Sequence, residues 1–279
     1  MKNGFLIILL ACISACASNV PTVNQRIRLA NQLAVQQGWH QEVYEDEGFD
    51  LAIFVPDDIK SSTVLTIYIE GDGLAWVGSS VASKDPTPSD PLALKLALKD
   101  SGPAAYIARP CQYTMSVQCD ARYWTSQRFS LAVVDSENRA VDFLKEKFKA
   151  SRVVLIGYSG GGAIATLLAA RRKDIDQLIT VAGNLDHRYW TQAHHISPLT
   201  GSLNPADYYQ ALENVPQVHF VGGQDKVIDG GVVNSYSIGF KKKPKVVVIP
   251  NYDHHCCWDQ DWAKIKGMND FSTHMIQKE

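Results

Sequence analysis

The sequence predicts an α/β domain built around a mostly parallel sheet, and two observations point to this class. Short runs of apolar, often β-branched residues alternate with segments of helical periodicity from about residue 50 onward. These runs are continuously apolar, as in strands that are buried on both faces. No internal repeat or Gly/Ser-rich linker divides the chain beyond residue 40. We therefore expect one domain with helices on both faces of the sheet.

The expected elements follow in order along the chain. A strand at 51–55 ends at Pro56, and a β-branched, aromatic strand at 63–69 ends at a Glu-Gly-Asp-Gly turn. Val141, Leu144 and Phe148 recur at helical spacing, which predicts an amphipathic helix over 135–150. Similar apolar runs predict strands at 104–108, 152–156, 178–182, 218–221 and 245–249, and helical spacing predicts helices at 91–99 and 163–172.

The segment from about 184 to 216 interrupts this alternation. It separates two predicted strands by more residues than an ordinary crossover needs, and it is rich in aromatic residues and histidine. Two interpretations remain open: a small lid over a site, or a surface excursion with its own helix at 205–213.

Overall charge excludes one class of function. The chain has 279 residues, with 27 Lys and Arg against 29 Asp and Glu, which gives a formal net charge of −2. Nucleic-acid-binding proteins carry a basic excess that is missing here. We expect no nucleic-acid partner and a monomeric protein.

The N-terminus has the pattern of an export signal. A basic start is followed by an apolar stretch at 5–13 that is too short to span a bilayer. Ile13-Ser14-Ala15-Cys16 resembles a bacterial lipobox, which implies cleavage before Cys16 and lipid on that cysteine. Cys12 also follows a suitable tripeptide, but its use would leave a very short signal. We expect a signal peptide at 1–15, a polar tether at 16–41 in which a short helix around 25–37 is left open, and a folded domain at 42–279. The expected location is lipid-anchored in the bacterial envelope.

Export makes disulfides plausible for the remaining cysteines. Four cysteines, Cys111, Cys119, Cys256 and Cys257, allow three pairings. Cys111–Cys119, which would close a small loop, is our first choice. Cys256 and Cys257 are adjacent, and their Cα atoms are closer than those of most disulfides, which disfavours a bond between them. The spacing does not match a zinc site, so we expect no metal.

Gly157-Tyr158-Ser159-Gly160-Gly161 matches the pattern G-x-S-x-G. The motif alone is weakly specific, but it lies between a predicted strand and a predicted helix, which is the setting of a nucleophile elbow. In such a turn the serine takes a strained conformation, and the free N–H groups of the helix face developing negative charge.

This combination resembles the α/β-hydrolase superfamily over about residues 45–279. The resemblance implies a catalytic acid and histidine after the serine. Asp225 follows the strand at 218–221 in a Gly-Gly-Gln-Asp turn, with Asp229 as the reserve candidate. His254 and the adjacent His255 follow the strand at 245–249, and His254 is our choice. The other histidines fit no such position, so we expect them to be structural.

The resemblance also implies an oxyanion hole with two N–H donors. Gly160, directly after the nucleophile, is one. The second comes from the turn after strand 63–69, where the family commonly has His-Gly-x-Gly and this chain has Glu70-Gly71-Asp72-Gly73. We choose the Asp72 N–H over that of Gly73. The Asp72 carboxylate must then turn away or pair with a cation such as Arg109 or Arg128.

These residues predict a serine hydrolase, most simply a carboxylic ester hydrolase that forms an acyl-enzyme without a metal or organic cofactor. A small-molecule or lipid ester is the expected substrate. Two alternatives use the same fold: a non-catalytic envelope lipoprotein that serves as a binding module, and an acyltransferase with the same triad.

Overall fold

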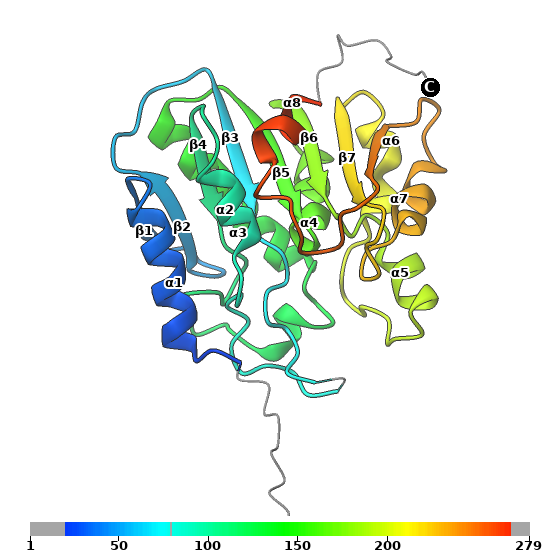
Figure 1. The fold of residues 1–279 in the computed structure, drawn as a ribbon, viewed down its shortest axis with the longest axis horizontal. Helices are drawn as coiled ribbons and strands as arrows, with labels where there is room; N and C mark the ends of the chain where they lie inside the picture. Colours follow the sequence, from blue (N-terminus) through cyan, green and yellow to red (C-terminus); the bar gives the residue numbers. More distant parts are fainter. Residues whose placement is uncertain (1–19, 79, 269–279) are drawn as a thin grey trace, which may run out of the picture.

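The computed structural model describes residues 20–78 and 80–268 and confirms the predicted fold class (Figure 1). Eight strands form one sheet in the order β1-β2-β4-β3-β5-β6-β7-β8. The pairs β1–β2 and β2–β4 are antiparallel, and all other neighbouring pairs in this sheet are parallel. The expected signal peptide and Cys16 lie outside the described residues.

Every strand predicted from the sequence is present, with ends shifted by at most three residues, and β1 is additional. The strands are β1 Trp39–Tyr44, β2 Leu51–Pro56, β3 Val64–Ile69, β4 Ala104–Ile107, β5 Arg152–Tyr158, β6 Ile175–Val181, β7 Gln217–Gly222 and β8 Lys245–Ile249.

Helices cover both faces of the sheet, because its strands are apolar on both sides. One buried apolar cluster receives side chains from α3, α4 and α7, and the other receives them from α1, α2 and α8. The helices are α1 Val23–Val35, α2 Leu92–Ala97, α3 Leu131–Phe148, α4 Gly160–Ala169, α5 His187–Ala193, α6 Tyr209–Leu212, α7 Gly230–Ser237 and α8 Trp262–Gly267, with 3₁₀ turns η1 Ala121–Trp124 and η2 Pro205–Tyr208.

The segment expected to be a tether is folded from Val23 onward, which moves the start of the domain from residue 42 to α1. A capping box between Thr22 and Gln25 begins this helix. Ala30 and Ala34, one turn apart, are fully buried against the sheet, and β1 pairs with β2. The helix left open around 25–37 is thus present as α1. Its packing against the sheet was missed, because the fully buried contact residues are two small alanines, which leave little apolar pattern in a polar segment.

The excursion at 184–216 packs against the body of the domain. It contains α5, η2 and α6, so the expected helix at 205–213 is present as a 3₁₀ turn followed by a short α-helix. Leu185, Leu199 and Leu212 are buried in the apolar cluster that also receives α4. This excursion therefore forms a packed side of the molecule.

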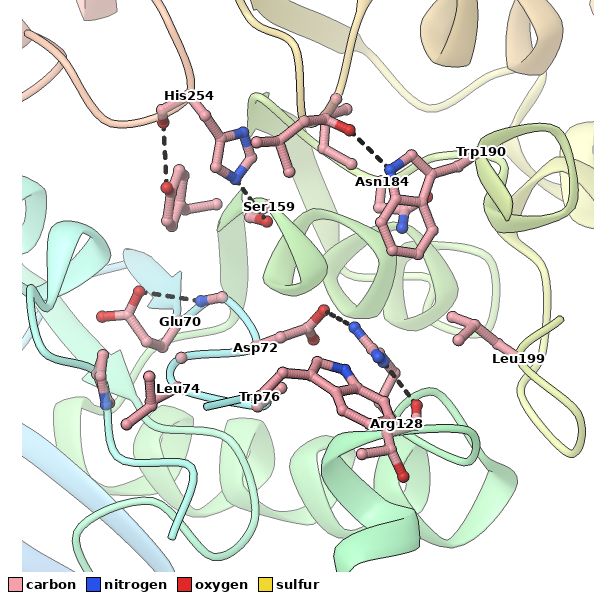
Figure 2. Close-up of a pocket in the computed structure, with 18 of the residues that line it drawn as sticks. Glu70, Asp72, Leu74, Trp76, Arg128, Ser159, Asn184, Trp190, Leu199 and His254 are labelled. Carbon is pink, nitrogen blue, oxygen red and sulfur yellow. Dashed lines mark hydrogen bonds and ion pairs between the residues drawn. The ribbon is translucent and has the colours of Figure 1, made fainter. Parts of the chain in front are cut away.

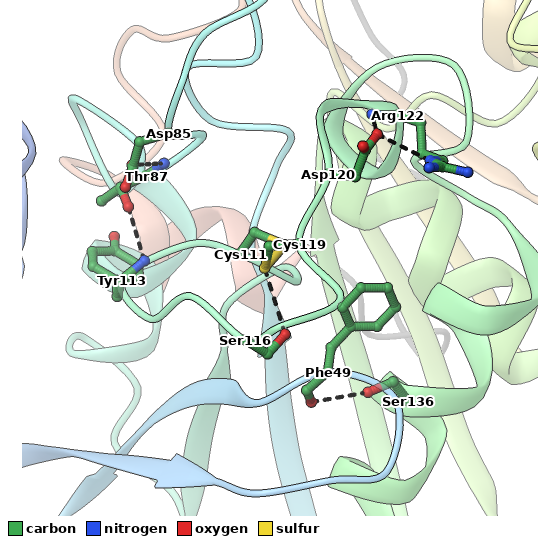
Figure 3. The surroundings of a disulfide bond; sticks show 10 residues. All are labelled: Phe49, Asp85, Thr87, Cys111, Tyr113, Ser116, Cys119, Asp120, Arg122 and Ser136. Atoms are coloured by element: carbon green, nitrogen blue, oxygen red, sulfur yellow. Dashed lines mark hydrogen bonds and ion pairs between the residues drawn. A yellow bond between two sulfur atoms is a disulfide. The ribbon is translucent and has the colours of Figure 1, made fainter.

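The structure contains the Cys111–Cys119 disulfide, with Cα atoms 5.7 Å apart. It also joins Cys256 to Cys257, a pairing that the sequence disfavoured. With Cys111 and Cys119 bonded, these two adjacent residues have only each other among the described cysteines. The first bridge closes a loop after β4 whose Tyr113 N–H donates to Thr87 Oγ1 (Figure 3).

Within residues 20–78 and 80–268, no helix is both long and apolar enough to cross a membrane.

The packing of α1 and β1 predicts a measurable contribution to stability. Trp39 is 7% exposed, whereas the nearby Val35 is 69% exposed. Trp39→Ala should lower the free energy of unfolding by about 3 kcal/mol, because it leaves a cavity in the core. Val35→Ala should change it by less than about 0.5 kcal/mol. Urea denaturation of both variants tests this, and equal stabilities would mean that the segment behaves as a tether.

Candidate active site

Ser159 occupies a sharp turn between β5 and α4. Its backbone has φ 51° and ψ −119°, in a region that residues with a side chain rarely adopt. Three backbone hydrogen bonds hold it there: the Ser159 N–H donates to Val181 O, and the Ser159 carbonyl accepts from Gly162 and Asn184. The strained serine is therefore fixed from both α4 and the segment after β6.

The structure brings Ser159, His254 and Asp225 into one hydrogen-bonded chain. His254 Nε2 lies 3.0 Å from Ser159 Oγ, and His254 Nδ1 lies 2.8 Å from Asp225 Oδ2. His254 is 6% exposed and Asp225 is 5% exposed. With Nδ1 carrying a proton toward the carboxylate, Nε2 is free to accept the serine proton.

Neighbouring hydrogen bonds orient both partners of the serine. Asp225 Oδ1 accepts from the N–H groups of Val227 and Ile228, at 2.7 and 2.8 Å, which leaves Oδ2 for the histidine. The Tyr158 hydroxyl donates to the carbonyl of His254 at 3.1 Å. Asp225 and His254 come from the loops after β7 and β8, and β5 presents the serine at the same edge of the sheet.

Neither alternative residue belongs to this hydrogen-bonded chain, although His255 lines the same cavity. Asp229 accepts from the Gly231 N–H as the N-cap of α7. His255 Nδ1 lies 3.3 Å from the Tyr158 hydroxyl. Away from the site, the fully buried His219 contacts Thr180 Oγ1, and burial lowers the pKa of His219 to about 3.

The loop after β3, Glu70 to Gly73, is the expected oxyanion loop. It lies directly against the turn that carries Ser159. The Asp72 carboxylate lies 2.6 Å from Arg128 Nη1 (Figure 2). It also lies 3.3 Å from Arg109 Nη1. A Cβ on Gly160 would lie 2.0 Å from Asp72 Oδ1, so only glycine fits beside this side chain. As the first residue of α4, Gly160 has an N–H without an intrahelical partner.

Glu70 has a role that sequence reasoning missed. Its Oε1 accepts from the N–H groups of Gly71 and Ala93, at 2.9 and 3.3 Å, and its Oε2 accepts from the Tyr106 hydroxyl at 3.1 Å. The carboxyl thus ties the start of the oxyanion loop to α2 and β4. Burial raises its pKa to about 7, although these hydrogen bonds act in the opposite direction. The unusual Glu in place of His was the signal that the sequence offered.

A cavity of about 910 Å³ opens at Ser159 (Figure 2). Its lining is largely apolar, with Trp76 and Leu74 from the oxyanion loop side and Trp190 and Leu199 from the excursion at 184–216. The excursion thus forms part of the wall of this cavity. Among the described residues, no group of three or more His, Cys, Asp or Glu side chains could hold a metal ion.

No family model and no curated protein matches the sequence. Solved structures with similar folds are nevertheless numerous. The esterase Pf2001 of Pyrococcus furiosus aligns with a TM-score of 0.60 at 13% identity, covering 84% of this chain and 93% of that one. An α/β serine hydrolase homologue from Coxiella burnetii aligns with a TM-score of 0.55 at 16% identity, covering 82% and 95%. Est1E from Butyrivibrio proteoclasticus aligns with a TM-score of 0.53 at 15% identity, covering 82% and 97%.

These neighbours are serine hydrolases and esterases, and the chain has the α/β-hydrolase fold that they share. At such identities the likeness concerns the fold. What this chain does must be argued from its own site.

Glu70 should make the stability of the protein depend on pH. Its pKa rises from 4.5 to about 7 on folding, so the folded state binds more protons between these values and the free energy of unfolding falls as the pH rises through them. Glu70→Gln keeps an acceptor but cannot ionise. This variant should reduce the fall between pH 5 and 7 by an amount on the order of 2 kcal/mol.

Urea denaturation across this pH range measures the effect, with the exposed Glu45→Gln as control. A pH dependence that is identical in wild type and Glu70→Gln would show that Glu70 does not titrate here. Glu137, whose pKa burial also raises to about 7, and His219, whose pKa burial lowers to about 3, titrate in both proteins. The prediction therefore concerns the difference between the wild type and Glu70→Gln.

Proposed function

We propose that this protein is a serine hydrolase that cleaves carboxylic esters through Ser159, His254 and Asp225. The observation that carries the proposal is the continuous hydrogen-bonded chain from Asp225 through His254 to Ser159. It lies at a cavity large enough for a small-molecule or lipid ester. The fold shared with esterases supports the same reaction class.

In this mechanism, Ser159 Oγ attacks the ester carbonyl carbon while His254 Nε2 takes the hydroxyl proton. Asp225 orients the imidazole and stabilises its positive charge. The N–H groups of Gly160 and Asp72 are the proposed donors to the oxyanion. When the tetrahedral intermediate collapses, the alcohol leaves with the proton from Nε2, and Ser159 remains acylated. A water molecule then transfers a proton to His254 Nε2 and attacks the carbonyl carbon of the acyl group. The acid is released, and the proton returns from Nε2 to Ser159 Oγ.

The pairing of the Asp72 carboxylate supports its place in this scheme. A free carboxylate beside a developing oxyanion would oppose catalysis by like-charge repulsion. Here Arg128 and Arg109 both contact it, and Arg109 Nε also lies 2.7 Å from Glu137 Oε1. Two guanidinium groups thus offset the charge of the Asp72 carboxylate and leave the Asp72 backbone available.

The two alternatives make different demands on the site. A non-catalytic binding module would not need His254 aligned with both Asp225 and Ser159, so this alignment favours an enzyme. An acyltransferase would use the same acyl-enzyme but pass the acyl group to an acceptor other than water. Product analysis separates transfer from hydrolysis.

We further propose that lipid on Cys16 holds the enzyme at the bacterial envelope. The described chain begins at the same end of the sheet as the loop that follows β3 (Figure 1). Arg26, near the start of α1, is 3.5 Å from Asp85 Oδ1 and donates to the carbonyl of Thr87, next to Pro88 of the cavity wall. Four residue steps from Cys16 to Val20 span at most about 14 Å. Anchoring would therefore keep the cavity near the lipid surface.

Treatment with a serine-directed fluorophosphonate tests the proposed nucleophile. We expect one adduct on the wild-type protein and none on Ser159→Ala in intact-mass measurements, because His254 activates only this serine. With an ester substrate, Ser159→Ala and His254→Ala should each lower kcat/KM by roughly 10⁴-fold.

His255→Ala serves as the matched control, since it removes the adjacent histidine and leaves the hydrogen-bonded chain intact. It should retain kcat/KM within about tenfold. A folded wild-type protein that forms no adduct would contradict the hydrolase proposal and favour a binding module.

Cys16→Ser tests the anchor. Expressed in a bacterium with its signal sequence, the wild-type protein should incorporate radioactive palmitate, and the Cys16→Ser variant should not. Cys12→Ser should leave this labelling unchanged. Palmitate labelling of Cys16→Ser equal to that of the wild type would contradict lipidation at this residue.

A further inference from the structure

Arg128 brings a positive charge to the wall of the cavity, and the proposed mechanism uses only part of its hydrogen-bonding capacity. The residue lines the cavity and is 6% exposed. Its Nη1 donates to Asp72 Oδ2 (Figure 2), and its Nε donates to the Thr125 carbonyl, both at 2.6 Å. The remaining nitrogen, Nη2, has no hydrogen-bond partner in the described part of the chain, yet it keeps surface that a ligand can reach. Because buried polar groups are normally paired, this free N–H₂ group indicates an acceptor supplied from outside the chain.

A second unpaired polar group lies two residues away on the same wall. Ser126 lines the cavity and is half-buried. Its carbonyl accepts from Ser202 Oγ at 2.8 Å, which fixes its backbone, but its own hydroxyl has no partner among the described residues. The neighbouring Thr125 hydroxyl is already used, because it donates to the Ala121 carbonyl at 2.7 Å. Arg128 Nη2 and Ser126 Oγ therefore offer two donors to the same occupant of the cavity.

The charges around Arg128 favour an anionic occupant. Arg109 and Arg128 carry two positive charges, and the carboxyl groups that contact them are those of Asp72 and Glu137. Burial raises the pKa of Glu137 to about 7, so this carboxyl is partly protonated near neutral pH. The cluster then has a fractional excess of positive charge. In a largely apolar cavity such an excess attracts an anion more strongly than it would in water.

Arg128 is also close to the proposed oxyanion hole. Its partner Asp72 lies directly beside Gly160, where a Cβ would be 2.0 Å from Asp72 Oδ1. His254 lies on the opposite side of Ser159 from Arg128 (Figure 2). The alcohol oxygen of an ester must face His254 Nε2, which gives it the proton. The acyl part of the substrate therefore extends toward Arg128.

We propose that Arg128 and Ser126 bind a carboxylate at the far end of the acyl group of the substrate. The preferred substrates are then half-esters of dicarboxylic acids, whose free carboxylate accepts from Arg128 Nη2 and Ser126 Oγ. A singly charged group matches the fractional excess of positive charge, whereas a dianion would bring uncompensated charge into the cavity. This inference rests on the proposed ester hydrolysis and adds the substrate class to it.

Matched pairs of esters test the inference. The charged members are the monomethyl esters of succinate, glutarate and adipate, and in each neutral partner a carboxamide replaces the free carboxylate. The two members of a pair have the same size and differ in charge. At pH 7 we expect the wild-type protein to favour the charged member of at least one pair by about tenfold or more in kcat/KM. Equal rates within all three pairs would overturn the inference even if hydrolysis itself is confirmed.

Two variants locate the carboxylate site. Arg128→Gln removes the charge and should bring the ratio of the preferred pair to near one. It should also lose stability, because Arg128 pairs with Asp72. Ser126→Ala removes only an unpaired hydroxyl and breaks no hydrogen bond of the described chain. It should fold like the wild type and lower the ratio by about threefold.

Ser89→Ala is the matched control for Ser126→Ala. Ser89 also lines the cavity and is half-buried, but it is followed by Asp90, which pairs with Lys95, and has no arginine beside it in the chain. This variant should keep the wild-type ratio. An unchanged ratio in Ser126→Ala, or an equal fall in Ser89→Ala, would overturn the proposed site.

A binding measurement separates this inference from the proposed function. In calorimetry, the Ser159→Ala protein should bind the charged ester of the preferred pair about tenfold more tightly than the carboxamide, and adding Ser126→Ala should lower this ratio about threefold. Binding needs no turnover, and fluorophosphonate labelling reports on the nucleophile independently. Equal affinities within all three pairs would refute the carboxylate site whether or not the protein cleaves esters.

Discussion

The strained turn at Ser159 is the constraint on which the rest of the structure depends. A residue with positive φ persists only where its surroundings hold it, and here β3, β6 and α4 all meet the turn. A Cβ on Gly161 would lie 2.3 Å from the carbonyl of Ile69, at the end of β3. The contacts that hold the serine also set the distance to the oxyanion loop.

A cluster of charged side chains, most of them buried, holds the oxyanion loop in place. Asp72 pairs with Arg128 and Arg109, and Arg109 also contacts Glu137. Removing one partner of such a buried pair would leave an uncompensated charge, which is strongly destabilising. Glu70 fixes the other end of the loop through backbone N–H groups of both the loop and α2. The charge of the carboxylates at this loop is thus offset by arginines at Asp72 and by the raised pKa of Glu70.

The folding of residues 23–44 changes how an anchor would act. A long flexible tether would let the domain turn freely. Here Arg26 of α1 donates hydrogen bonds to the carbonyls of Asp85 and Thr87, next to the cavity wall. Only a short link would separate a lipidated Cys16 from this rigid part. The proposed anchor would then restrict the orientation of the cavity as well as its location, which suits substrates that are met at or near a lipid surface.

The sequence by itself determined the class of fold, seven of the eight strands and the candidate nucleophile, because buried parallel strands and a strand-turn-helix motif leave a local pattern of apolar residues and glycines. It also favoured Asp225 and His254, with Asp229 and His255 as the alternatives. Which histidine ring lies between Asp225 and Ser159 depends on the tertiary structure, and the ring there is that of His254. The tertiary structure likewise decided the packing of α1 through Ala30 and Ala34, the hydrogen bonds of Glu70 and the place of Arg128 at the cavity. None of these leaves a local pattern, because each is defined by partners that are distant in the chain.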